Sequence, residues 1–253
     1  MLRRGTDLGF RMSAWLAKAL VLLSWGPAGY GDELFYGALR TIEISVLAYF
    51  LGLTIGALGA TGKLYGPKWL KELLHGYTTL VRAVPELVLL LLLYYAGTDV
   101  VNTMLGGFGK GPIEVNGLAA AVGVLGFVQG AYSTEVIRAA ILAIPHGQME
   151  AARAFGMGGP LMARRIILPA MLPFAMPGLA NLWLIVTKDS ALVSVVGGIA
   201  ELSLVTKQAA GVTKQYLLLY LVTAFIYLAI TLFSNRIFNW LENMTRRGQR
   251  KLT

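Results

Sequence analysis

The sequence predicts an all-α protein that crosses a membrane several times. Hydrophobic residues make up 56% of the 253 residues and charged residues only 14%, whereas a soluble domain usually carries charge on about 25%. The mean hydropathy is accordingly positive, at +0.64. Apolar runs of roughly 20 residues, the length that a helix needs to cross a bilayer, recur along the chain. Much of the surface is therefore expected to face lipid.

Five core spans are expected, near 35–60, 76–97, 117–142, 170–196 and 216–241. The preceding stretch 12–25 is apolar but short, contains Lys18, and fits either a sixth N-terminal span or an interfacial helix. No A-x-A site follows it, which disfavours a cleaved signal peptide. The expected organisation is an N-terminal segment over 1–34, a transmembrane domain over 35–241 and a basic tail over 242–253.

The distribution of Lys and Arg predicts the orientation, because such residues gather in cytoplasmic loops. The loops 98–116 and 197–215 hold only Lys110, Lys207 and Lys214. The loops 61–75 and 143–169 and the tail hold many more: Lys63, Lys68, Lys71, Arg153, Arg164, Arg165, Arg246, Arg247, Arg250 and Lys251. The second set, and with it the C-terminus, is therefore expected in the cytoplasm.

Several kinds of chemistry are not supported by the residues. The chain has no cysteine and two histidines, His75 and His146, so neither a metal site nor a catalytic constellation is expected. The glycine-rich run 106–111 lacks the spacing of a phosphate-binding loop. The net charge of +9 does not indicate nucleic acid, because the basic residues lie in short segments between apolar runs. Small residues in the spans, among them Gly52 and Gly56, predict close helix packing within the chain rather than a subunit interface.

The loop 144–169 is longer than a connection between two spans requires, which indicates a function of its own. Its first half predicts a short helix ended by Gly156 in a left-handed cap. Gln148, Ala151, Ala152 and Phe155 fall on one face of that helix. Small residues around one aromatic side chain favour docking in a partner's groove over lying on the bilayer, since interfacial helices have larger apolar faces.

Glu150-Ala151-Ala152, Gly156 and Ile166-x-Leu168-Pro169 together resemble the EAA signature of permease subunits of binding-protein-dependent ABC importers. Further stretches at 37–45, 76–95, 130–148 and 188–192 are similar to the amino-acid branch. The form RAVPEL at 82–87 looks most like the histidine/lysine/arginine/ornithine and opine permeases. The resemblance implies the type I ABC importer transmembrane fold and a bacterial inner-membrane location.

The same resemblance implies the partners. Two ATP-binding cassette subunits would bind and hydrolyse ATP, so this chain itself would be no enzyme and hold no cofactor. A second permease subunit, in this branch often a different homologous chain, would complete the pore, and a substrate-binding protein would deliver the amino acid. The coupling residues implied are Gln148, Glu150, Ala151, Ala152, Phe155 and Gly156.

Charged residues inside the spans are candidates for the translocation path, because an ionisable group in lipid costs about 2.5–3.5 kcal/mol or more. Glu86, Lys188, Asp189 and Ser190 are the candidates. Glu86 can instead pair with Arg82. Arg40 with Glu43 and Glu135 with Arg138 have the spacing of pairs on a helix face. Acids and bases along one path would suit a cationic amino acid, which also carries an α-carboxylate.

Two other classes stay open on the residues alone. A self-contained secondary transporter or channel would usually show inverted repeats, and no repeat is visible here. A membrane-embedded enzyme would need a histidine cluster, an acid dyad or an activated nucleophile.

Overall fold

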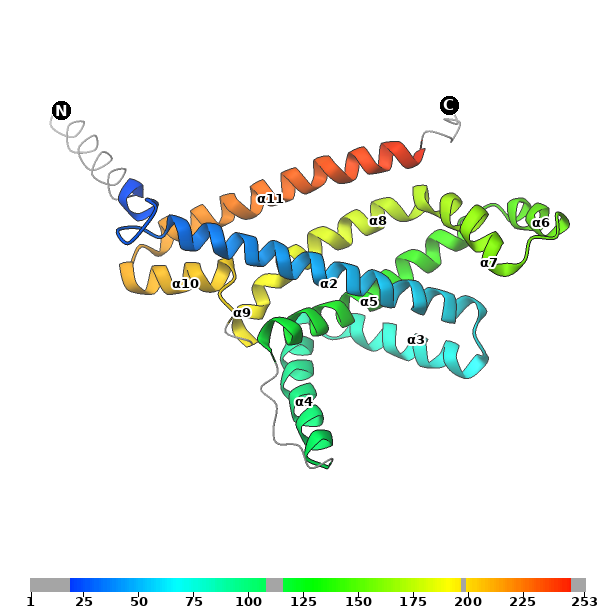
Figure 1. Ribbon diagram of the computed structural model, residues 1–253, viewed down its shortest axis with the longest axis horizontal. Coiled ribbons are helices and arrows are strands. Elements are labelled where there is room, and N and C mark those ends of the chain that lie inside the picture. Colours follow the sequence, from blue (N-terminus) through cyan, green and yellow to red (C-terminus); the bar gives the residue numbers. More distant parts are fainter. Residues whose placement is uncertain (1–18, 108–115, 197–198, 247–253) are drawn as a thin grey trace, which may run out of the picture.

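The computed structural model describes residues 19–107, 116–196 and 199–246, and all its regular elements within these ranges are helical. Figure 1 shows long helices running alongside one another, with α4 leaving the bundle. The main helices are α2 (Gly31–Tyr65), α3 (Lys68–Ala83), α4 (Glu86–Gly107), α5 (Gly117–Leu142), α8 (Leu168–Asp189), α10 (Leu202–Thr213) and α11 (Tyr216–Thr245). Shorter helical pieces are α6 (His146–Ala154), α7 (Gly159–Met162), a π-helical turn (Ala163–Ile167), a 3₁₀ turn (Ser190–Leu192) and α9 (Val193–Val196).

Within the described ranges, four helical stretches are long and apolar enough to cross a membrane. They are Gly31–Tyr65, Gly117–Leu142, Gly159–Val195 and Tyr216–Thr245. The pair α3 and α4 passes the same test as one broken unit, bent by 118°. The predicted all-helical polytopic fold is confirmed. Residues 12–18 of the expected N-terminal segment, most of the glycine-rich run and the end of the basic tail lie outside the described residues.

The second expected span, 76–97, is not one continuous helix, and its interior proline explains why. Pro85 has no N–H to donate, and its ring disfavours helical backbone at the preceding residue. Val84 accordingly is extended, with φ −96° and ψ 140°. The chain turns there, and Glu86 begins α4 instead of lying in mid-helix.

The most extensive helix contact joins α2 and α5, and glycine makes it close. Gly52 lies against the Gln129 side chain, and Gly56 lies against Ser133. A Cβ atom on Gly56 would come within 2.9 Å of the Ser133 carbonyl carbon and within 3.0 Å of the next backbone nitrogen. Small residues allow such an approach where lipid provides no hydrophobic drive for association. The predicted packing role of these glycines within the chain is confirmed.

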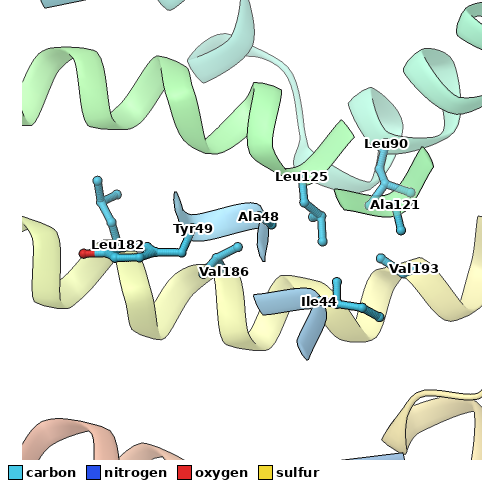
Figure 2. Packing of buried hydrophobic residues seen from close by; sticks show 9 residues of the cluster. All are labelled: Ile44, Ala48, Tyr49, Leu90, Ala121, Leu125, Leu182, Val186 and Val193. Carbon is cyan, nitrogen blue, oxygen red and sulfur yellow. The ribbon is translucent and has the colours of Figure 1, made fainter. Parts of the chain in front are cut away.

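A hydrophobic core gathers the middle of the bundle around this pair (Figure 2). It is formed by nine buried side chains from α2, α4, α5, α8 and α9: Ile44, Ala48, Tyr49, Leu90, Ala121, Leu125, Leu182, Val186 and Val193. Two polar bonds tie α8 to it. The Tyr49 hydroxyl donates to the Leu179 carbonyl at 3.0 Å, and the Gln129 amide donates to the Leu182 carbonyl at 3.2 Å.

A buried carboxylate fixes α10, which lies at the end of the bundle away from α6 (Figure 1). Glu201 is fully buried and caps α10, accepting from the backbone N–H groups of Ser203 and Leu204 at 2.8 Å. The Thr41 hydroxyl of α2 donates to the same carboxylate at 3.3 Å. Burial raises the pKa of Glu201, although these hydrogen bonds oppose the shift. Sequence reasoning did not single out this residue, because its partner Thr41 is remote in the chain.

The α2–α5 contact predicts the effect of adding one methyl group. Gly56→Ala should destabilise the fold by about 1–3 kcal/mol, because the new Cβ meets backbone that cannot move aside independently. Gly123→Ala on α5 is the matched control, since nothing lies within 4 Å of its Cβ position. Thermal unfolding in detergent compares the two variants. Equal stability of both would contradict the packing role of Gly56.

Candidate functional site

The loop after α5 forms a short exposed helix, α6, that begins after Pro145. Of the face predicted for docking, Ala152 is buried against the chain itself, while Gln148, Ala151 and Phe155 are exposed. Phe155 is 84% exposed, the highest value among the large apolar side chains described. An apolar ring so exposed at the tip of a polar loop is available to a partner.

Gly156 ends α6 in a left-handed conformation, with φ +71°. The Gly156 N–H donates to the Arg153 carbonyl at 2.9 Å, and the Met157 N–H donates to the Ala152 carbonyl at 3.1 Å. These two bonds form a Schellman motif, which satisfies carbonyls at the helix end. The predicted left-handed cap is confirmed. Glu150 and Arg153 are both exposed. Within the described residues, they form no ion pair with each other.

The loop is anchored to the bundle at both ends. Ile144, before α6, and Ile167, the last residue of the π-helical turn, are buried together. They pack with Ala60 of α2 and with Ile137 and Ile141 of α5. The loop that carries the exposed helix is therefore connected at both ends to α5 and to the start of α8 through packed side chains.

The structure brings together two of the four residues predicted for the translocation path. Glu86, at the start of α4, and Asp189, at the end of α8, interact directly through their carboxyl groups. Tyr132 of α5 interacts with both of them. Lys188 is exposed, and Ser190 is buried with its hydroxyl donating to the Thr187 carbonyl at 2.8 Å. The predicted path residues thus separate into an acidic pair, an exposed Lys188 that acts electrostatically on Asp189, and a buried Ser190 that is bonded to Thr187.

Arg82 makes no ion pair with Glu86 within the described part of the chain, which removes the alternative partner considered for Glu86. Arg82 nevertheless lies near enough to act electrostatically on Tyr132. It therefore neighbours the acidic pair without neutralising it directly.

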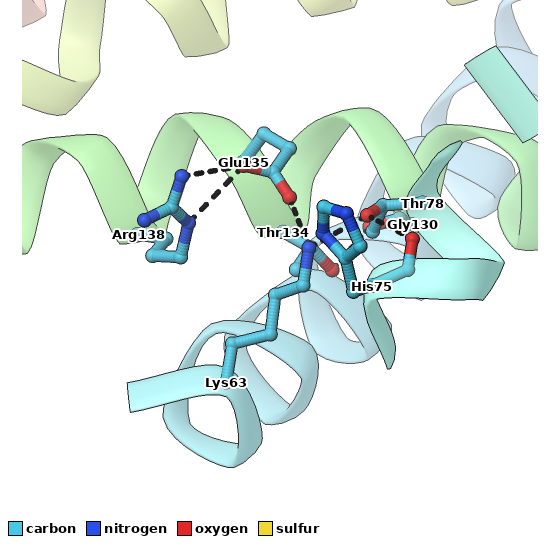
Figure 3. A network of polar contacts seen from close by, with 7 residues as sticks. All are labelled: Lys63, His75, Thr78, Gly130, Thr134, Glu135 and Arg138. Carbon is cyan, nitrogen blue, oxygen red and sulfur yellow. Dashed lines mark hydrogen bonds and ion pairs between the residues drawn. The ribbon is translucent and has the colours of Figure 1, made fainter. Parts of the chain in front are cut away.

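A second polar cluster lies where α2, α3 and α5 meet, towards the end of the bundle that carries α6 (Figure 3). Glu135 of α5 binds Lys63 of α2, and it accepts from the Arg138 guanidinium at 3.0 and 3.1 Å. Lys63 also donates to the Thr78 hydroxyl of α3 at 2.7 Å. The predicted Glu135–Arg138 pair is confirmed, as is Arg40–Glu43 at 2.6 Å. Lys63 was missed as a partner because it is 72 residues away in the sequence.

Known proteins resemble this chain over nearly its whole length. Residues 52–247 match the family described as binding-protein-dependent transport system inner membrane component. The nopaline transport system permease protein NocQ of Agrobacterium fabrum is 42% identical over 233 residues, covering 91% of this chain and 98% of the relative. The histidine/lysine/arginine/ornithine transport system permease protein HisQ of Escherichia coli is 37% identical over 223 residues, covering 88% and 97%.

Solved structures agree in fold. A chain from the crystal structure of an amino acid ABC transporter with histidines is 31% identical, with a TM-score of 0.71, covering 85% of this chain and 95% of the other. A chain of the inward-facing MetNI methionine ABC transporter has the same TM-score at 19% identity, which supports the fold alone. This chain belongs to the family of inner membrane components of binding-protein-dependent transport systems.

Proposed function

We propose that this chain imports cationic amino acids, or opines built from them, as one permease subunit of an ATP-driven transporter. The observation that carries the proposal is the rigidly anchored loop that presents α6 and Phe155 beyond the bundle. The relatives named for nopaline and for histidine, lysine, arginine and ornithine transport support the substrate class.

The loop supports coupling to an ATPase through its shape and its attachments. Phe155 and Ala151 offer a small face with one aromatic anchor, which suits a groove on a partner. Ile144 and Ile167 connect that face to α5 and α8. In this proposal two ATP-binding cassette subunits bind and hydrolyse ATP, and their closure moves the spans through α6. The permease itself holds no cofactor and catalyses no reaction.

The remaining assembly follows from the same proposal. A second permease subunit, a homologous different chain, completes the pore, and a substrate-binding protein delivers the amino acid from outside.

Glu86 and Asp189 supply negative charge inside the spanning region, where an uncompensated carboxylate is costly. A guanidinium or ammonium group that comes close to the pair relieves that cost. The acidic pair therefore favours substrates with a cationic side chain.

Gly156→Val should uncouple ATP hydrolysis from transport. A β-branched residue disfavours a φ near +71°, so that the hydrogen bonds of the Schellman motif break. The end of α6 then no longer holds Phe155 in position for a partner. Gly158→Val is the matched control, because Gly158 has φ −67° and nothing contacts its Cβ position. Uptake and ATPase co-purification are measured for both variants. Normal uptake and normal association with the ATPase in Gly156→Val would contradict the coupling role. Transport by this chain without any ATPase would indicate a secondary transporter.

Reporter fusions test the orientation. A reporter after Thr253 and a tag near Gly158 should both read cytoplasmic, because the basic loops follow the positive-inside rule. Tags near Gly107 and Gly211 should read outside. A tag at residue 5 separates five spans from six. A periplasmic reading after Thr253 would overturn the orientation.

Glu86→Gln should weaken uptake of arginine and lysine about tenfold, with a smaller effect on any neutral substrate that the system accepts. The reason is that the change replaces one carboxyl group of the acidic pair with a neutral amide of nearly the same shape. Glu43→Gln, which breaks only the exposed pair with Arg40, is the control. Uptake is compared at matched protein levels. An equal loss for every substrate would contradict recognition of the cationic side chain by Glu86.

A further inference from the structure

A cavity of about 600 Å³ opens between α2, α3 and α5, beside the cluster of Figure 3. All its lining residues are polar or charged, and the ones that matter here are Lys63, Lys71, His75, Arg82, Glu135 and Arg138. Sites for small molecules in proteins have volumes of about 300–1,000 Å³. The cavity is therefore large enough for an amino acid, and its wall has no apolar side chain against which a hydrophobic ligand could pack.

The charges of this wall leave a positive excess. Four Lys or Arg side chains face two Glu side chains, a difference of +2 when His75 is left out of the count. Glu135 is already bound by Lys63 and Arg138. Within the described ranges, neither Lys71 nor Arg82 takes part in an ion pair. These two cations are the ones available to an anionic ligand.

The polar wall cannot face lipid hydrocarbon. Helix α3 turns Leu70, Leu74 and Tyr77 towards a separate apolar pocket shared with α2. Lys71, His75 and Arg82 lie on its other side. Arg82 lies within the expected span 76–97. A charged side chain exposed to lipid at that depth would cost about 2.5–3.5 kcal/mol. The wall therefore faces a water-filled compartment, which favours a soluble anion over a lipid head group.

Tyr132 connects the cavity electrostatically with the acidic pair. Arg82 lines the cavity and also acts on Tyr132, which interacts with Glu86 and Asp189. A molecule can therefore meet negative charge at the break between α3 and α4 and positive charge along α3. That sequence of charges matches a cationic side chain joined to a carboxylate.

We propose that this cavity is a carboxylate-binding station on the cytoplasmic half of the path. Arg82, assisted by Lys71, binds the α-carboxylate of the amino acid while its cationic side chain lies near Glu86 and Asp189. A guanidinium suits this role because its fork of N–H donors matches a carboxylate in bidentate geometry. The station rests on the proposed function. It adds that the substrate is bound in one orientation, with its carboxylate at Arg82 and its side chain towards Glu86 and Asp189.

The test pairs two ligands with two forms of the protein. The complete permease–ATPase assembly, in nanodiscs of neutral lipid without ATP or binding protein, is titrated with arginine and with agmatine, which is arginine without its carboxylate. Arg82→Gln should weaken arginine binding about tenfold, the value of a charge-assisted hydrogen bond, and leave agmatine binding unchanged. Arg82→Lys keeps the charge but not the bidentate fork, so it should lose less arginine affinity than Arg82→Gln. Lys68→Gln, on the same helix but outside the cavity, should match the unchanged protein.

Lys71→Gln provides a second variant should Arg82→Gln fail to assemble, and it should show the same preference for losing arginine. Equal losses of affinity for arginine and agmatine, or no loss of affinity in either variant, would overturn the proposed station. The proposal that the chain is an importer subunit would be unaffected. Loss of the arginine preference in nanodiscs of anionic lipid would assign the cavity to a lipid head group instead. Failure of the unchanged assembly to bind arginine at all would contradict the proposed substrate class itself.

Discussion

Close packing of α2 against α5 is the contact on which the other parts of the structure depend. In a bilayer the lipid tails are as apolar as leucine, so that helices associate through fit and polar bonds rather than through hydrophobic burial. Gly52 and Gly56 provide that fit on α2. The same two helices then hold α8 through the Tyr49 and Gln129 bonds and hold the loop 144–169 through Ile137 and Ile141. Separating them would dismantle the core and the loop anchor together.

The break at Val84 and Pro85 distributes charge along the bundle. An unbroken helix would continue the α3 direction and carry Glu86 with it. The turn instead sets Glu86 at the start of α4, where it meets Asp189 from α8. Arg82, only four residues earlier, stays on α3 and lines the basic cavity. One proline thus separates an acid and a base that would otherwise be placed to pair on adjacent helical turns.

Local features of the sequence predicted local structure well. The apolar runs indicated the spans apart from 76–97, which is broken, and Gly156 indicated a left-handed cap, because each depends only on neighbouring residues. Contacts between remote segments were not predictable in this way. Nothing near Glu135 in the sequence points to Lys63, and nothing near Glu201 points to Thr41. Helix periodicity placed Ala152 and Phe155 on one face, but the return of the chain through α7 and the π-helical turn decides that Ala152 is buried and Phe155 exposed.

Helix α5 connects the proposed coupling loop with both charged regions. It leads into α6 through a short connection that ends at Pro145, and it carries Glu135 and, one turn earlier, Tyr132. Glu135 binds α2 through Lys63, while Tyr132 interacts with Glu86 of α4 and Asp189 of α8. A rotation of α5 about its axis therefore moves Glu135, which lines the cavity, and Tyr132, which contacts the acidic pair, in the same step. Because packed helices shift between discrete arrangements rather than deforming continuously, docking at α6 would change both charged regions together, as alternating access requires.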